Sequence, residues 1–298
     1  MSLGEKQAPK PKRRWFQFRL RTLLVMVALV AGAFRWLDLW VNRELDKRRR
    51  EKATIAWIEG MSGSLFFDGN EYDGYGQISW WLKTKDTWFG PRVATVVLNQ
   101  EEVRDISPLK ELKSLEQIYL SGTSVTDLTP LAGFEGLWVL SIEDSKISDL
   151  STLAGMNNVE RLFLSETEVS DLFPLATLKK VTMLWLDDTR VSDLSPLTGM
   201  ERLSQLHLSK TKVIDLSPLA KLKSLIVLNV EDTRVSDLTP LAQHQYLSEL
   251  RLARTEVSDL SPLVGLKRLQ SLDLNGTKVT DEQIDQLQLA LPNCDISR

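Results

Sequence analysis

Acidic residues near a histidine and a serine are the side chains of this sequence that could most readily do chemistry. Asp187, Asp188 and Asp193 fall within seven positions, in the stretch DDTRVSDLSPL of residues 187–197. Clustered carboxylates can bind a metal ion or act as general acids and bases. Asp187, His207 and Ser209 also have the residue types of a hydrolytic triad. Both interpretations depend on the elements that position these side chains.

The surrounding chain is a tandem repeat with a period of 22 residues. Nine units begin at Val93, Leu115, Leu137, Val159, Val181, Leu203, Leu225, Leu247 and Leu269. Apolar residues return at positions 1, 4, 6, 11, 14, 17 and 20 of each unit. Such self-similarity predicts a solenoid, in which each coil buries its apolar face against its neighbours. The alternation over positions 3–7 predicts one short strand per coil.

The pattern LxxLxLxxTxVxDLxPLxxL resembles the leucine-rich-repeat family, specifically its short 22-residue bacterial type, the internalins. The resemblance covers residues 93–290. It implies an α/β fold, a curved right-handed solenoid with a parallel sheet on the concave side and short helical turns on the convex side. One position departs from the family, because its usual Asn at position 9 is Thr in seven units, with Ser145 and Glu101 as exceptions. We expect these threonine hydroxyls to bond to backbone in the adjacent coil.

The repeat accounts for Asp193. An aspartate stands at position 13 of all nine units, at Asp105, Asp127, Asp149, Asp171, Asp193, Asp215, Asp237, Asp259 and Asp281. Pro follows three residues later in seven units, and an aspartate before a helical turn can accept backbone N–H bonds. A calcium site needs six or more oxygens, whereas this column offers one carboxylate per coil. We therefore expect a structural column, with no metal site and no cofactor.

Positions 2, 3, 5, 7 and 8 are expected to point outward and to line the concave face. Position 5 places Phe163, Trp185 and His207 on adjacent strands, about 4.8 Å apart. The further candidates near this row are Tyr119 and Arg251 at position 5, and Arg161 and Met183 at position 3. Aromatic residues with Arg and Met are typical of protein interfaces. Cross-strand packing that only stabilises the sheet is the alternative.

Acidic pairs occupy positions 7 and 8 of alternate units. They are Glu143–Asp144, Asp187–Asp188 and Glu231–Asp232. Stacked strands would hold successive pairs about 10 Å apart. The alternation can record the duplication of a two-coil unit, and it keeps like charges off adjacent strands. It can also form an acidic rim for a basic partner, to which Asp187, Asp188, Glu231 and Asp232 would contribute.

No segment resembling a catalytic domain remains once the repeats are assigned. A flat open sheet offers no oxyanion site to Asp187, His207 and Ser209, so we expect no enzyme. The first hypothesis is a protein partner on the concave face. The alternatives are a cell-envelope polysaccharide stacked on Trp185 and Tyr119, and a structural spacer without a ligand. The acidic repeats disfavour nucleic acid.

The N-terminal segment is basic and apolar, unlike the rest. Residues 1–52 carry 14 Lys and Arg against 5 Asp and Glu, whereas the remainder carries 23 against 35. The apolar run Leu23 to Phe34 lies between Trp15, Phe16 and Phe18 on one side and Trp36 and Trp40 on the other. Trp15 to Trp36 is roughly 31 Å of helix, about the thickness of a bilayer core.

This pattern predicts a single-pass anchor in a bacterial inner membrane, with the repeats on the extracytoplasmic side. Two alternatives are a signal peptide cleaved near Ala33, after the A-x-A pattern of residues 31–33, and a twin-arginine export signal at Arg13-Arg14. Seven basic residues precede the predicted helix and six, from Arg43 to Lys52, stand shortly after it, a difference too small to set the topology.

The remaining segments are expected to cap the solenoid. Residues 1–52 form the tail, anchor and juxtamembrane segment, 53–92 an aromatic-rich cap, 93–280 the repeats and 281–298 a helical cap. Within the first cap we expect a helix near 45–60, a strand at 64–67, a loop and a helical turn around Trp80–Leu82. Thr280 and Gln283 fit a capping box that opens the last helix. The single cysteine, Cys294, is expected to be buried in the second cap.

Overall fold

The chain divides into two compact units, Met1–Ala53 and Thr54–Arg298. The computed structural model describes the backbone of residues 14–67 and 93–298, and the side chains of residues 25–66 and 93–298. The helical turn expected around Trp80–Leu82, the polar loop before it and the basic tail at 1–13 lie outside the described residues.

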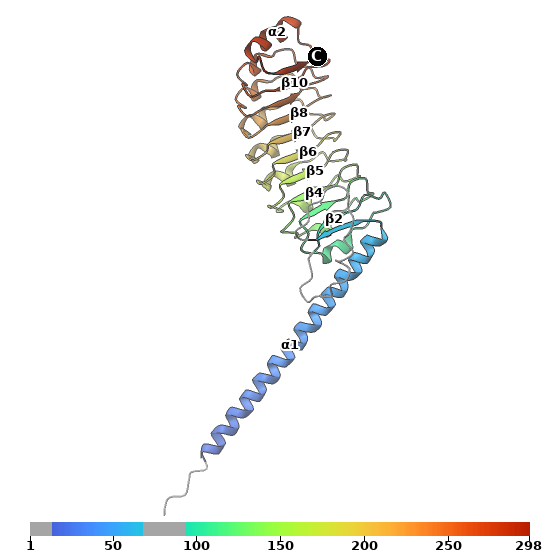
Figure 1. The fold of residues 1–298 in the computed structure, drawn as a ribbon, viewed down its shortest axis with the longest axis vertical. Helices are drawn as coiled ribbons and strands as arrows, with labels where there is room; N and C mark the ends of the chain where they lie inside the picture. The colour runs from blue at the N-terminus through green and yellow to red at the C-terminus, as the bar shows by residue number, and fades with distance from the viewer. Residues whose placement is uncertain (1–13, 68–92) are drawn as a thin grey trace, which may run out of the picture. The chain divides into compact units, whose positions relative to one another are not determined.

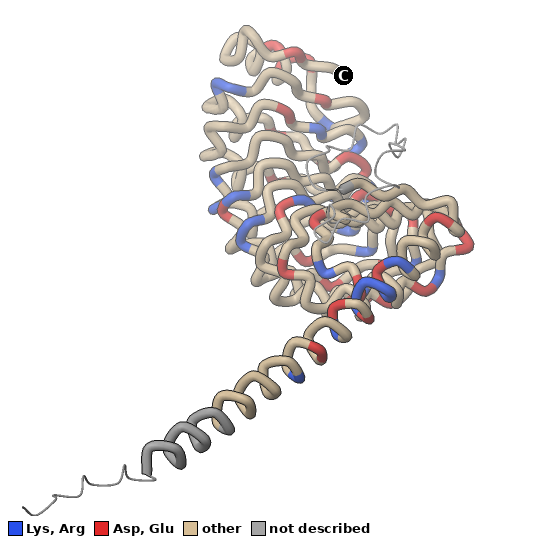
Figure 2. The backbone as a smooth tube through the Cα atoms, turned by 60° about the horizontal axis from the view of Figure 1, so that its bottom comes forward, with Lys and Arg blue, Asp and Glu red and all other residues tan. Residues whose placement is uncertain are grey.

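The N-terminal helix α1 spans Arg14–Gly60, so the predicted anchor and the helix expected near 45–60 are one continuous helix. Its large apolar side chains between Val25 and Trp40 are exposed. The sequence of this stretch has one basic and one acidic residue, Arg35 and Asp38. The charged residues of α1 gather beyond it (Figure 2). Among the described residues, one helix is long and apolar enough to cross a membrane by length and composition, over Val25–Gly60.

The strands form a single sheet in which neighbours follow the order of the chain (Figure 1). They are β1 (Ser64–Phe67), β2 (Val93–Val97), β3 (Gln117–Tyr119), β4 (Val139–Ser141), β5 (Arg161–Phe163), β6 (Met183–Trp185), β7 (Gln205–His207), β8 (Val227–Asn229), β9 (Glu249–Arg251), β10 (Ser271–Asp273) and β11 (Asp295–Ser297). β1 pairs antiparallel with β2, and every other neighbouring pair is parallel. This is the right-handed leucine-rich-repeat solenoid that the sequence predicts. Its coils are numbered 1 to 9 after the sequence repeats, so coil 1 begins at Val93 and coil 9 at Leu269.

From β3 to β10, each strand covers only positions 3–5 of its coil, so the prediction of positions 3–7 was too long. The chain turns at position 8, where the backbone is left-handed in eight coils: Gly122, Asp144, Glu166, Asp188, Lys210, Asp232, Arg254 and Gly276. The N–H at this turn donates to the position 7 carbonyl of the next coil, as Asp188 does to Ser209 at 2.8 Å. An extended strand cannot pass through a left-handed residue, because its φ is positive.

Short 3-10 helices form the opposite side of each coil. They are η2 (Ser107–Glu111), η3 (Thr129–Leu131), η4 (Ser151–Leu153), η5 (Phe173–Thr177), η6 (Ser195–Gly199), η7 (Ser217–Lys221), η8 (Thr239–Leu241) and η9 (Ser261–Leu263). The aspartate of position 13 precedes each one, and in all eight coils its carboxylate accepts the N–H two residues later at 2.8 Å. The bonds from Ser195 hold the pKa of Asp193 below its ordinary value. Asp281 differs, because it is the first residue of α2 (Asp281–Ala290).

The core of the coils consists of the predicted apolar positions. In coil 4, for example, Val159, Leu162, Leu164, Val169, Leu172, Leu175 and Leu178 are all buried. The threonines of position 9 are buried in this core, apart from the half-buried Thr277. The expectation that they bond to the adjacent coil was wrong. Each hydroxyl donates to the carbonyl three residues earlier in its own coil, as Thr189 does to Leu186 at 2.7 Å, and Ser145 does the same. The turn that follows position 6 brings that carbonyl closer than any in the next coil.

Both ends of the stack are covered. At the N-terminal end, Ile58 of α1 and Leu65 of β1 are buried, and the Thr54 hydroxyl donates to the carbonyl of Pro108 at 3.1 Å. At the C-terminal end, the capping box of Thr280 and Gln283 opens α2 as predicted. Leu287, Leu291 and Cys294 are buried against the last coil, and this burial raises the pKa of the Cys294 thiol.

Candidate partner-binding site

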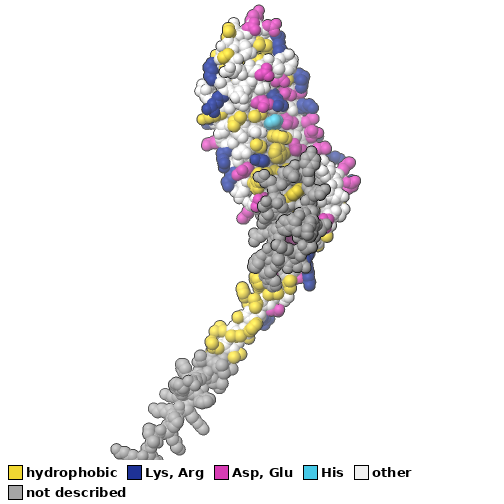
Figure 3. Space-filling model, viewed as in Figure 1, with side chains coloured by type: hydrophobic (Ala, Val, Ile, Leu, Met, Phe, Trp, Pro, Cys, Tyr) yellow, Lys and Arg dark blue, Asp and Glu magenta, His cyan; other side chains and the backbone are white. Residues whose placement is uncertain are grey.

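The outward side chains of the sheet form rows that run across the coils. In each three-residue strand the middle residue is buried, so positions 3 and 5 face away from the core. The parallel register places Phe163 opposite Trp185, and Trp185 opposite His207. We call these three residues the aromatic row. In Figure 3, hydrophobic side chains gather beside the visible histidine, and acidic side chains border them.

The members of the aromatic row stack against one another. The ring centroids of Phe163 and Trp185 are 4.8 Å apart in an edge-to-face arrangement, and those of Trp185 and His207 are 5.1 Å apart. Aromatic pairs at such distances are favourable beyond the area they bury. All three side chains are half-buried, and the Trp185 Nε1–H is buried without an acceptor among the described residues. The row is therefore packed, with one polar group left unsatisfied.

Arg161 and Met183 stand beside the row in register with each other. The Arg161 guanidinium lies over the ring of Trp138, 5.4 Å from its centroid, which is a cation–π distance. Trp138 was not among the predicted site residues. The available signal was its position 2, which belongs to the outward set. The aromatic surface therefore extends by one coil toward the N-terminus.

The structure separates Tyr119 and Arg251 from the aromatic row. Tyr119 is two strands away from Phe163, with Ser141 between them, and its hydroxyl donates to Gln117 at 3.1 Å. Arg251 is two strands beyond His207, and its guanidinium pairs with Glu249 at 2.6 Å. These two predicted residues therefore lie at the margins of the surface.

Asp187 approaches His207 and Ser209, as the residue types suggested. Its carboxylate accepts the Ser209 N–H at 2.7 Å and lies 3.8 Å from His207 Nδ1. Burial lowers the pKa of His207 below its ordinary value of 6.5, and the charge of Asp187 opposes that shift. The carboxylate is bonded to backbone rather than to the imidazole, so the arrangement fixes the edge of the sheet and does not activate the Ser209 hydroxyl.

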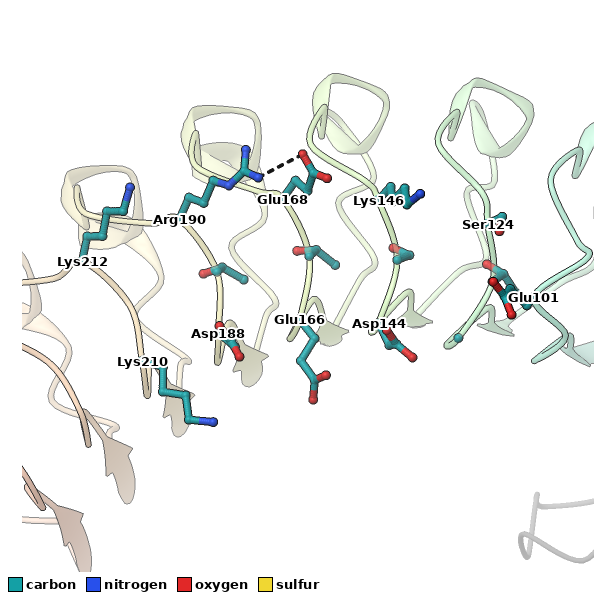
Figure 4. A pocket seen from close by; sticks show the side chains of 15 residues that line it. Glu101, Ser124, Asp144, Lys146, Glu166, Glu168, Asp188, Arg190, Lys210 and Lys212 are labelled. Atoms are coloured by element: carbon teal, nitrogen blue, oxygen red, sulfur yellow. Dashed lines mark ion pairs between the residues drawn. The ribbon is translucent and has the colours of Figure 1, made fainter.

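The other predicted acidic residues lie at the turn. Asp188 and Asp232 occupy the left-handed position 8, while Glu231 precedes it. Positions 8 to 10 of coils 2 to 5 line a groove of about 840 Å³ along this edge of the sheet, together with Glu101, Lys210 and Lys212. In Figure 4 the position 10 residues Lys146, Glu168 and Arg190 form one wall, and the position 8 residues Asp144 and Glu166 point away from them. Among the described residues, no group of three or more His, Cys, Asp or Glu side chains could hold a metal ion.

Ion pairs link successive coils within column 10 and within column 8, the rows formed by the residues at those positions, and the column 8 pair lies beyond the groove. Arg190 pairs with Glu168 at 3.3 Å in column 10. In column 8, the Arg254 guanidinium binds Asp232 with two hydrogen bonds of 2.5 and 2.6 Å and lies 4.0 Å from Glu231. That contact lowers the pKa of Asp232. One of the two negative charges of the acidic pair of coil 7 is thus balanced within the protein.

No family model and no curated protein matches the chain. Among solved structures, it is similar to the internalin InlF of Listeria monocytogenes, with 29% identity over 67% of this chain and 59% of that one, at a TM-score of 0.65. Internalin C2 of the same species is 32% identical over 63% of this chain and 81% of that one, at a TM-score of 0.59. The plant peptide hormone receptor RGFR1, solved in complex with RGF2, shares the fold at 17% identity, 68% and 35% coverage and a TM-score of 0.58.

The repeating strands and 3-10 turns define a leucine-rich-repeat solenoid. With the identity to internalin C2 over most of that protein's length, the chain belongs to the internalin-type leucine-rich-repeat proteins of bacteria. It spans 59% of the length of InlF.

Proposed function

We propose that this chain is a membrane-anchored recognition module that binds a protein partner on the concave face of its repeats, and that it is not an enzyme. The observation that carries the proposal is the aromatic row of Phe163, Trp185 and His207, which is stacked, half-buried and bordered by charged residues. Interface hot spots combine aromatic residues and Arg in this way. Trp138 and Arg161 enlarge the apolar centre that such an interface requires.

The packing of Trp185 favours a protein over a polysaccharide. A sugar needs a free aromatic face on which to stack, whereas the Trp185 ring has Phe163 on one neighbouring strand and His207 on the other. The unsatisfied Trp185 N–H suits a partner's backbone carbonyl or side-chain oxygen. RGFR1, which shares this fold, is a peptide hormone receptor, and this supports a peptide or protein ligand.

The proposed anchor is the apolar stretch of α1, whose large side chains are exposed from Val25 to Trp40. An exposed apolar helix surface of this length is stable in a bilayer and not in water. In this proposal the repeats lie on the extracytoplasmic side of the membrane. An aromatic-rich cap at 53–92 precedes them in the chain, and a helical cap at 281–298 follows them. Carbonate extraction and the mass of the mature protein test the anchor, since cleavage near Ala33 would give a shortened, extractable product. Protease digestion of spheroplasts tests the topology, because only repeats outside the cytoplasm would be degraded.

The binding proposal is tested by affinity purification of the detergent-solubilised chain from its native membrane. Trp185→Ala and Phe163→Ala each remove one member of the aromatic row. Phe173→Ala is the matched control, because Phe173 is an aromatic residue of η5 that is 75% exposed on the opposite side of the coil. We expect a co-purifying protein that is lost with the first two variants and kept with the third. Loss of a retained glycan instead would identify a polysaccharide ligand, and no difference among the variants would leave only a spacer.

A further inference from the structure

The three acidic pairs of the edge do not have the same surroundings. Each pair stands at positions 7 and 8 of an odd coil, and position 8 of the following coil is one of its two neighbours in the column. That neighbour is Arg254 after the pair of coil 7 and Lys210 after the pair of coil 5, but it is Glu166 after the pair of coil 3. Two of the three pairs are thus followed by a cation and the remaining one by a third acid.

Arg254 shows how a cation fits this edge. Its guanidinium is bidentate to Asp232 and reaches Glu231, while the residue before it, Ala253, is small and buried. Paired hydrogen bonds of this kind are among the strongest that a carboxylate forms. The left-handed φ of 57° at Arg254 is matched by 58° at Glu166, so the two turns have the same backbone.

At coils 3 and 4 the cation is missing. Among the described residues, no Lys or Arg lies within ion-pair distance of Glu143, Asp144 or Glu166. Figure 4 shows Asp144 and Glu166 directed away from Lys146. Burial raises the pKa of Glu143, and the charges of Asp187 and Glu166 raise it further against the bond from the Ser141 hydroxyl. Like charges on adjacent strands destabilise a sheet unless a counter-charge is supplied.

An unpartnered hydroxyl lies in the same place. Ser165 occupies the position that Ala253 has in coil 8, and it is only 8% exposed. It stands in column 7 between Glu143 and Asp187, as the bonds Asp144 N to Ser165 O and Glu166 N to Asp187 O show. Its Oγ approaches the Glu143 carboxylate but makes no hydrogen bond of normal geometry with it or with any other described group. A buried polar atom without a partner is uncommon in a folded protein.

We propose that Glu143, Asp144 and Glu166, with the Ser165 hydroxyl, form a cation-binding notch that receives an arginine side chain of the protein partner. The guanidinium would take the place that Arg254 fills in coil 8, bonding to the carboxylates and donating to the Ser165 hydroxyl. Phe163 and Trp185 lie on the strands of coils 4 and 5 beside the notch, so the partner's arginine would be bound next to its apolar contact. The inference rests on the proposed function, since it specifies the partner chemistry of the same face.

The test uses N-acetyl-arginine amide as the probe and the full chain in deuterated detergent at low salt. Saturation-transfer-difference NMR reports weak binding through the ligand's own protons, and N-acetyl-citrulline amide is the uncharged ligand of the same shape. Glu166→Arg should fill the notch from within, as Arg254 does in coil 8. Arg254→Glu should empty the equivalent notch of coil 7.

We expect an arginine signal from the natural chain that falls by about tenfold with citrulline and with Glu166→Arg, the loss of one charged hydrogen-bonded contact. Arg254→Glu should raise the arginine signal. Equal signals from the two ligands, or an arginine signal unchanged by Glu166→Arg, would overturn the notch. If Trp185→Ala abolishes partner capture while Glu166→Arg leaves both capture and the arginine signal intact, the notch fails and the proposed concave-face function stands.

Discussion

The hydroxyl of the position 9 threonine is predicted to contribute more to stability than a methyl group in its place would. Thr189 is 5% exposed, and its Oγ1 donates to the carbonyl of Leu186 at 2.7 Å. Among the described residues, no other hydrogen bond reaches that carbonyl. Thr189→Val keeps the shape of the side chain and leaves the carbonyl buried without a donor.

The size of the effect follows from two opposing contributions. An unsatisfied buried acceptor costs about 1–3 kcal/mol. The methyl group that replaces the hydroxyl recovers about 0.8 kcal/mol of hydrophobic burial. The net destabilisation is therefore about 0.2–2 kcal/mol, which lowers the melting temperature of a unit this large by up to about 8 °C.

Thr198→Val is the matched control. The Thr198 hydroxyl makes the same kind of bond, to the carbonyl three residues earlier at 2.7 Å, but this residue is exposed and water can replace it. Its effect should stay within about 0.5 kcal/mol. Thermal unfolding of the full chain in micelles, followed by circular dichroism at a wavelength sensitive to strands, measures both variants. A Thr189→Val chain as stable as the Thr198→Val chain would refute the reasoning.

Three further perturbations follow from the repeat geometry. His244 stands at position 20, where the other coils have an apolar residue; it is fully buried, and that burial lowers its pKa, so stability should fall as the pH drops below 6.5. His244→Leu should reduce this loss of stability in melting curves recorded between pH 5 and 8. An unchanged loss of stability at acid pH would exclude His244 as its source. Because the pKa of Glu143 is raised, its ionised form lowers the stability of the fold at neutral pH. The Glu143→Gln variant should therefore have a higher melting temperature than the natural chain at pH 7, and the difference should shrink as the pH falls toward 4.5. A lower melting temperature of the variant at pH 7 would contradict this. Leu206→Ala should lower the free energy of unfolding by about 2–5 kcal/mol, because the Leu206 side chain is fully buried. Ile214→Ala should lower it by less than about 1 kcal/mol, because Ile214 is 53% exposed. Equal losses for the two variants in chemical denaturation would show that the coil is not packed as described.

The repeat period was enough to predict the buried positions, the sheet order and the aspartate column. These features depend on residue types that recur every 22 positions, so the assignment of a position in one coil is supported by the same residue type in the other coils. The hydrogen bond from the Ser195 N–H to the Asp193 carboxylate was also predictable, because it is local and forms wherever an aspartate precedes a turn by two residues. The capping box of Thr280 was readable for a similar reason, since both of its bonds are local.

The features that the sequence did not reveal depend on backbone direction or on a neighbouring coil. The left-handed turn at position 8 is occupied in part by residues such as Glu166 and Lys210, which do not favour it. The glycines and aspartates that do accept this conformation were its only signal: Gly122, Asp144, Asp188, Asp232 and Gly276. The threonine bonds were assigned to the wrong coil because the turn decides which carbonyl is nearest. The pairing of Arg161 with Trp138, and of Arg254 with Asp232, joins residues 22 or more positions apart and needed the register of the sheet.

Site-specific photo-crosslinking in the native membrane tests the central claim most directly. A benzoylphenylalanine at position 185 would report contacts of the aromatic row, and the same group at position 173 would report the opposite side of a neighbouring coil. Concave-face recognition of a protein predicts one discrete adduct of higher mass from position 185 and none from position 173. Identical adduct patterns from the two positions, or no protein adduct from position 185, would contradict it.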